Sequence, residues 1–332
     1  MSLKQLLIDV HTHCYLPRYA AFLRQRAHVP KIFTRGNEER LLILDDEPSA
    51  GRPVGPQYWD RDEKLKFMDV HGIDVSIVST ANPWLDFLSP SAAHTLATEL
   101  NNDLEEYCAT SPLVPASEGI QRLYGFGLLP LVPDVSVDAI LQIIGQISSL
   151  SHLKGVIMGT RGVGRGLDDP ALEPVWEALA TTKLVVFLHP HYGLGQGAKE
   201  AWGECDNGHV LPLAMGFPME TTIHDVRYYV SKLYYDAVNY GPEEMGFVAD
   251  VIGRGGAYAH SQSQQTREDR TSGYHRMLFG TDHPFFPPLA GERKWKSVVE
   301  NLQAIQDVRG WGDSHKVAVR GGNAIEIFGL RQ

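Results

Sequence analysis

The stretch Leu6–His13, which reads LLIDVHTH, runs from apolar residues into two histidines that one residue separates. Side chains at positions i and i+2 of an extended strand point to the same face of a sheet. His11 and His13 can therefore present two imidazoles to one point, as two ligands of one metal ion must be presented. Because isolated His-x-His pairs are common by chance, a metal site requires further ligands elsewhere in the chain.

Two other apolar runs also end in residues of the type that binds metal ions. Leu184–His191 (LVVFLHPH) leads to His189, and Met277–Asp282 (MLFGTD) leads to a carboxylate. Imidazoles and a carboxylate suit a divalent transition metal, above all Zn²⁺. Taken alone, His189 could be a hydrogen-bonded histidine at a strand end and Asp282 could cap a helix. Together with the His-x-His pair, they indicate one metal site.

Short apolar runs alternate with stretches of helix length along the chain. We expect strands at 6–10, 73–79, 124–129, 155–158, 184–188, 233–238 and 277–280, and helices near 60–70, 90–110, 135–150, 170–182, 220–231, 242–253 and 295–308. This alternation predicts an α/β fold with a parallel sheet, and ligands at several strand ends predict a (β/α)8 barrel of the TIM type. Since the seven expected strands are one fewer than the barrel requires, we expect a distorted barrel.

The chain of 332 residues is expected to form a single barrel domain, 1–332. Residues 14–58 mix proline, glycine and charged residues, which predicts an insertion after the first strand. Residues 190–219 are rich in glycine and proline and predict a long loop on the substrate side. The polar stretch 254–273 predicts an exposed loop without regular structure.

Composition limits the classes of partner and the compartment. The formal net charge of −10 argues against nucleic acid or an anionic membrane as the main partner, while it allows a small anionic substrate. Three cysteines far apart in the sequence (Cys14, Cys108 and Cys205) favour free thiols in a reducing compartment. With no secretory leader and no apolar run of membrane-spanning length, we expect a cytosolic enzyme.

Several motifs together are similar to those of one enzyme family. They are Asp9–His13 (DVHTH), Phe187–Gly193 (FLHPHYG) and Gly280–Phe285 (GTDHPF), with support from Asn82–Trp84 (NPW) and Gly216–Thr222 (GFPMETT). This set resembles the amidohydrolase superfamily, in its branch of aminocarboxymuconate-semialdehyde, γ-resorcylate and iso-orotate decarboxylases. The longer blocks around these motifs are most similar to fungal 6-methylsalicylate and iso-orotate decarboxylases. The resemblance covers most of residues 6–238 and 276–330.

The resemblance implies a non-oxidative decarboxylation that uses a metal, Zn²⁺ or another divalent ion such as Mn²⁺, and no organic cofactor. The ligands would be His11, His13, His189 and Asp282. The metal would chelate the substrate carboxylate together with its ortho oxygen, and Asp282 would deliver a proton to the ring carbon. The family places a polar substrate contact at Asn82. Phe217 and Phe285 would pack against the substrate ring, although each could equally belong to the core.

The implied substrate is a small ortho-oxygenated aromatic or heterocyclic carboxylate. We expect 6-methylsalicylate, converted to m-cresol in polyketide secondary metabolism, and keep iso-orotate (uracil-5-carboxylate) as an alternative. A lactone or amide hydrolase of the same superfamily and an inactive homologue are the remaining alternatives. The resemblance also implies a homodimer if the barrel is intact.

One part of the family pattern is missing from this chain. In the relatives, the helix after the GFPMETT-type motif leads into strand 6, which ends in an Ala-His-Ser-Gly-Gly-type motif. The histidine of that motif lies beside the metal, and an arginine soon after it reaches into the neighbouring subunit's site. Here the helix from Glu220 leads directly to Leu233–Val238, which resembles strand 7, and His224, Arg227 and His260 are no substitutes. We favour a misread or alternatively spliced chain, in which 254–273 is read-through sequence, over a genuine variant that closes its barrel differently.

Overall fold

A curled parallel sheet forms the centre of the molecule. The computed structural model describes residues 5–45, 47, 51–115, 117, 119–163, 166–191, 232–238, 241–253, 272–288 and 292–330. Five parallel strands pair in the order β1-β5-β6-β7-β8. Their bounds are β1 (Ile8–Cys14), β5 (Val75–Thr80), β6 (Leu123–Leu128), β7 (Leu153–Gly159) and β8 (Val185–His189).

Two further parallel strands continue this sheet on the other side of β1. Strand β10 (Met277–Leu278) pairs with β9 (Tyr235–Asp236). The chain that follows β10 bonds to β1, since the Val10 amide donates to the Phe279 carbonyl at 3.0 Å and the Asp282 amide donates to the His11 carbonyl at 2.7 Å. The seven expected strands are thus confirmed, in the order β9-β10-β1-β5-β6-β7-β8, as part of a TIM-type α/β barrel.

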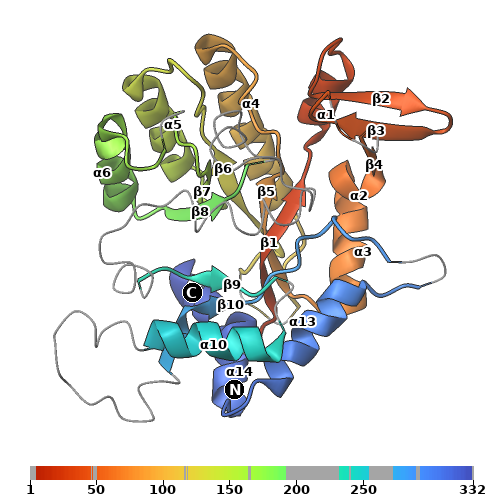
Figure 1. The fold of residues 1–332 in the computed structure, drawn as a ribbon, viewed down its shortest axis with the longest axis vertical. Helices are drawn as coiled ribbons and strands as arrows, with labels where there is room; N and C mark the ends of the chain where they lie inside the picture. The colour runs from red at the N-terminus through yellow and green to blue at the C-terminus, as the bar shows by residue number, and fades with distance from the viewer. Residues whose placement is uncertain are drawn as a thin grey trace.

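Helices cover the outer face of the sheet, as the alternating pattern predicted. Figure 1 shows α4 (Pro90–Ala109), α5 (Val137–Ser149) and α6 (Glu173–Thr182) beside β6, β7 and β8. Helix α5 buries one stripe, formed by Ile140, Ile143, Ile144 and Ile147. It packs closely because β6 carries a glycine here: a Cβ on Gly127 would lie 2.6 Å from Cδ1 of Ile147.

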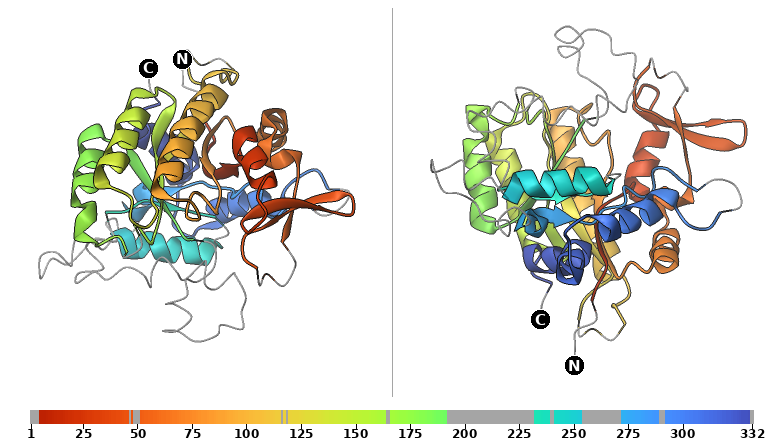
Figure 2. Two further views of the ribbon diagram at one scale, coloured as in Figure 1. Left: turned by 90° about the horizontal axis from the view of Figure 1, so that it is seen from above. Right: turned by 60° about the horizontal axis from the view of Figure 1, so that its bottom comes forward.

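The expected insertion contains structure that the sequence did not reveal. After α1 (Pro17–Arg24), an antiparallel sheet of β2 (Lys31–Arg35), β3 (Glu38–Leu42) and β4 (Arg52–Val54) projects from the barrel, and both views of Figure 2 show it standing apart. These strands are short and carry several charged residues, so their apolar pattern is weak. Helices α2 (Pro56–Trp59) and α3 (Arg61–His71) lead back to β5.

The C-terminal helices cover the end of the sheet where β1 begins. They are α10 (Pro242–Gly253), η2 (Ser272–Arg276), α13 (Lys296–Asp307), α14 (Asp313–Val317), η3 (Ala318–Gly322) and α15 (Asn323–Ile327). The last three were not predicted, and they pack closely: a Cβ on Gly321 would lie 2.0 Å from the Leu6 carbonyl oxygen. In the described part of the chain, no helix is both long and apolar enough to span a membrane.

Most of the expected helices are confirmed within two or three residues, and the expected helix 170–182 divides into η1 (Pro170–Leu172) and α6. Four predictions lie outside the described residues, wholly or for the most part: the helix 220–231, the loop 190–219, the polar stretch 254–273 and the missing strand 6. The interpretation of 1–332 as one domain stays a prediction.

Asn101 joins helix α4 to the end of β6. Its Nδ2 donates to the Leu128 carbonyl at 3.0 Å, and the Leu128 amide donates to its Oδ1 at 2.7 Å. The side chain is buried, so Asn101→Leu leaves two backbone groups without partners. We expect the free energy of unfolding to fall by about 2–4 kcal/mol in a denaturant titration. Asn102→Ala, on the same helix, removes an exposed hydrogen bond from Gln146 Nε2 at 2.9 Å, so it should change the free energy by less than about 1 kcal/mol; equal effects would contradict the prediction.

Candidate metal centre

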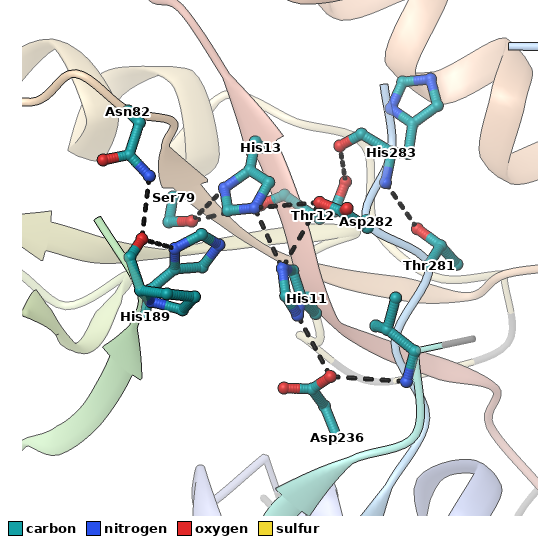
Figure 3. A network of polar contacts seen from close by, with 12 residues as sticks. His11, Thr12, His13, Ser79, Asn82, His189, Asp236, Thr281, Asp282 and His283 are labelled. Atoms are coloured by element: carbon teal, nitrogen blue, oxygen red, sulfur yellow. Dashed lines mark hydrogen bonds and ion pairs between the residues drawn. The ribbon is translucent and has the colours of Figure 1, made fainter. Parts of the chain in front are cut away.

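The carboxyl ends of three strands deliver the four expected ligands to one place (Figure 3). His11 and His13 lie on β1, His189 is the last residue of β8, and Asp282 follows β10. Strands β1 and β8 lie at opposite ends of the five-stranded order, so the curl of the sheet is what brings their histidines together. One nitrogen from each of the three imidazoles lies within 4.8 Å of the other two.

The spacing of the ligand-type atoms of His11, His13 and Asp282 fits one shared cation. His11 Nε2 lies 3.1 Å from His13 Nε2, and Asp282 Oδ1 lies 3.4 Å and 3.3 Å from these two nitrogens. Ligands placed about 2.0–2.2 Å from a zinc ion, at the angles of a tetrahedron or octahedron, are separated by about 2.8–3.6 Å. The donor set also consists of the groups that zinc and manganese bind, so the residues present fit a divalent metal.

Each imidazole turns its other nitrogen toward an oxygen atom. His13 Nδ1 lies 2.9 Å from Ser79 Oγ, and His189 Nδ1 lies 2.9 Å from the Pro190 carbonyl. His11 Nδ1 lies 3.2 Å from Asp236 Oδ1. A proton on Nδ1 suits the contacts of His13 and His189 and leaves the Nε2 lone pairs of these two rings available for a metal ion, while His11 Nδ1 faces the Asp236 carboxylate as an ion pair.

The electrostatics of the site also favour the ligand forms of His13, His189 and Asp282. Burial lowers the pKa of His13 to about 4, and burial together with the nearby imidazoles lowers the pKa of His189 to about 3. Both rings are therefore neutral at pH 7, as metal ligands must be. Burial disfavours ionisation of Asp282, but hydrogen bonds with the imidazoles of His11 and His13 outweigh it and hold the carboxyl pKa well below its usual range.

Asp236 is a residue of this site that the sequence analysis missed. It lies on β9, and burial of the His11 ring lowers the imidazole pKa, but the carboxylates of Asp236 and Asp282 reverse that effect and raise it well above the ordinary value. A signal existed, because Asp236 interrupts an otherwise apolar strand near its carboxyl end, as Asp282 does. The run 233–238 had been interpreted as a strand alone.

The three expected substrate contacts have different outcomes. The Nδ2 of Asn82 donates to the Pro190 carbonyl at 3.1 Å, and its buried Oδ1 has no hydrogen-bond partner among the described residues. The ring centroid of Phe285 lies 5.6 Å from that of His13, so Phe285 borders the histidine cluster. Phe217 lies outside the described residues.

The insertion also reaches this site. The guanidinium carbon of Arg52, on β4, lies 4.5 Å above the ring of Phe285. Arg52 also donates to the hydroxyl of Tyr15 and, at 3.5 Å, to the Asn82 carbonyl. Arg52 could not be predicted from the sequence, because nothing in the pattern of 14–58 places that segment beside the strand ends. The roles of all these residues as ligands, proton donor or substrate contacts stay predictions.

Known proteins resemble the chain over its whole length. No family model matches it. The apo crystal structure of Metarhizium anisopliae IDCase is 34% identical, with 100% of both chains covered and a TM-score of 0.75. The 2-amino-3-carboxymuconate-6-semialdehyde decarboxylase of Dictyostelium discoideum is 23% identical over 98% of this chain and 92% of its own length.

Two further matches are more partial or more distant. Decarboxylase yanB of Aspergillus niger is 36% identical over 55% of this chain and 43% of its own length. A dihydroxybenzoic acid decarboxylase from Polaromonas sp. JS666, solved with bound manganese, is 17% identical with a TM-score of 0.60 and 98% of both chains covered. At that identity the second match supports the fold alone.

Ser79 tests whether the contacts of the imidazoles prepare them for metal binding. Ser79→Ala removes the oxygen that faces His13 Nδ1, so the ring loses its fixed orientation. We expect Zn²⁺ affinity, measured by competition with a chromophoric chelator, to fall by about 10- to 100-fold.

Ser76 provides the matched control, because it is buried on the same strand and its Oγ has no hydrogen-bond partner among the described residues. Ser76→Ala should change the affinity by less than about twofold. A Ser79→Ala variant that binds Zn²⁺ as tightly as the wild type would rule out an orienting role for this hydroxyl.

Proposed function

We propose that this chain, which belongs to the decarboxylases of the amidohydrolase superfamily, is a metal-dependent, non-oxidative carboxy-lyase. Its proposed substrate is a small ortho-oxygenated aromatic or heterocyclic carboxylate. The observation that carries the proposal is the convergence of His11, His13, His189 and Asp282 at the carboxyl ends of the barrel strands. We assign these four residues as the metal ligands.

The metal we propose is Zn²⁺ or Mn²⁺, because imidazoles and a carboxylate are groups that both ions bind. When bound, a divalent ion supplies Lewis-acid polarisation and a template for the substrate carboxylate and its ortho oxygen. The neutral rings of His13 and His189 add no charge to the centre, so the Asp282 carboxylate is the anionic ligand among the four.

The remaining chemistry falls to residues around the ligands. Decarboxylation breaks the bond between the ring carbon and the carboxylate, and the electron pair left on that carbon takes a proton as CO₂ leaves. We assign Asp282 to carry this proton, which the carboxylate must first take up from solvent because its neighbours favour the ionised form. Asn82 offers its buried Oδ1 to a donor on the substrate, and Phe285 offers a ring face.

For the substrate we propose 6-methylsalicylate, converted to m-cresol in secondary metabolism. The similarity to the A. niger decarboxylase yanB supports a fungal decarboxylase. Iso-orotate is the second candidate, since the motifs of the chain resemble decarboxylases of both acids. We further infer a cytosolic enzyme, and a homodimer if the barrel is intact.

Incubation with 6-methylsalicylate, iso-orotate and a panel of lactones separates the candidate activities. We expect CO₂ release with m-cresol or uracil as the product, loss of activity after treatment with a chelator, and recovery on addition of Zn²⁺ or Mn²⁺. Asp282→Asn should lower kcat by about 100-fold or more, since it removes both a ligand charge and the proposed proton carrier. Opening of a lactone without CO₂ release would favour the hydrolase alternative instead.

Metal analysis of the purified protein separates an active enzyme from an inactive homologue. The wild type should hold about one equivalent of divalent metal, and His189→Ala should reduce the content several-fold because one of four ligands is lost. His94→Ala, on α4, should leave it unchanged. A wild-type content below about one tenth of an equivalent would favour the inactive homologue.

A further inference from the structure

We propose that Lys64, on helix α3, is a positioning residue of the metal centre, and that it acts on Asp282 through His283. The inference rests on the proposed function, because it concerns how one proposed ligand is held. Lys64 lies on a helix rather than at a strand end, and no step of the proposed reaction uses it.

The ammonium group of Lys64 lies among four acceptors, of which the His283 carbonyl, at 3.5 Å, is the most distant. Its Nζ is 2.5 Å from Thr12 Oγ1, 2.5 Å from His283 Nδ1 and 3.1 Å from the His13 carbonyl. The side chain is 1% exposed, so no water competes for these contacts. Since an ammonium has three N–H donors, each donor finds one acceptor in this arrangement.

These three contacts connect two separate pieces of chain. Thr12 and His13 belong to β1, whereas His283 belongs to the segment after β10. The Thr12 hydroxyl, which accepts from Lys64, donates in turn to the His283 carbonyl at 3.0 Å. Lys64 therefore links the strand that carries His13 to the segment that carries Asp282.

Aromatic packing holds the His283 ring in place, so Lys64 can position the segment that carries Asp282 through this ring. It stacks on Phe67 with 3.7 Å between ring centroids and lies 4.6 Å from the ring of Trp295. Lys64 and Phe67 are three residues apart on α3, so they lie on the same side of the helix and approach His283 together.

Asp282 needs this support because its backbone is strained. Its φ of +56° lies in the left-handed region, which costs a non-glycine residue on the order of 1–3 kcal/mol and persists where the surroundings enforce it. On one side, Thr281 donates its amide and hydroxyl to the buried carboxylate of Asp9 at 3.1 Å and 2.8 Å. On the other side, His283 is held by Lys64. The two neighbours of Asp282 are thus each bound by a buried ionisable side chain (Figure 3 shows Thr281 and His283).

Burial of Lys64 removes water from its ammonium group, which costs free energy, and the contacts of that group offset part of the cost. Burial lowers the pKa of the ammonium to about 8, while the charge of Asp9 acts in the opposite direction. An apolar residue would fill this position more cheaply if it served packing alone. The fixed donors of an ammonium are what the acceptors on β1 and at His283 require.

Co²⁺ is the probe for the test, because its visible absorption reports which ligands bind it and in what geometry. We expect Lys64→Met to lower Co²⁺ affinity by about 10-fold or more and to change the absorption bands, since the Asp282 carboxylate is no longer held in place. Thr12→Val, which keeps the shape of the side chain and removes the linking hydroxyl, should produce the same spectral change with a smaller loss of affinity. It serves as the test if Lys64→Met does not fold.

Lys66→Met is the matched control, because Lys66 is exposed on the same helix and pairs with Glu63. It should leave affinity and spectrum unchanged. If the folded Lys64→Met and Thr12→Val proteins both bind Co²⁺ with wild-type affinity and spectrum, the role of Lys64 is overturned while the metal centre stands. If the wild type binds no Co²⁺, the proposed metal centre fails, and this inference fails with it.

Discussion

The pairing of β1 with the segment after β10 sets the distance between the first and last of the proposed ligands. The His11 carbonyl accepts from the amides of Thr281 and Asp282 at 3.2 Å and 2.7 Å, and the His13 amide donates to the His283 carbonyl at 2.7 Å. Because these are backbone bonds, they place the Asp282 carboxylate against the imidazoles whatever the rest of the sheet does. The buried side chains of Asp9 and Lys64 reinforce this pairing from its two sides.

Burial gives the centre its chemical character as well as its rigidity. It lowers the pKa values of His13 and His189, which keeps both rings neutral, while the carboxylate of Asp282 retains its charge through hydrogen bonds with the imidazoles. Two neutral imidazoles and a carboxylate suit a cation, and His11, whose raised pKa favours the protonated ring, must release its proton when it becomes a ligand. The contacts of Ser79, Pro190 and Asp236 then set which nitrogen of each ring faces the centre.

The strands of the barrel could be predicted from the sequence, whereas its short peripheral elements could not. The seven parallel strands followed from apolar runs with no alternation, the signature of strands buried on both faces, and β5 is buried along its whole length. Strands β2, β3 and β4 could not be recognised, since they are half-exposed and short. The last three helices were missed because each is five residues long. The missing strand 6 is expected between the helix 220–231 and the strand 233–238, and that helix lies outside the described residues, so the loss of strand 6 stays a prediction.

By itself, the sequence determined the fold class, the family and the four residues that converge, because strand periodicity and ligand chemistry are properties of local stretches. The tertiary structure alone decided which other side chains surround them. These side chains are Asp236 on a strand, Arg52 in the insertion and Lys64 on a helix. All three are far from His11 in the chain, and no local sequence pattern predicts contacts between such distant segments. Their positions depend on how the sheet curls and how the insertion folds back, which are results of packing over the whole molecule.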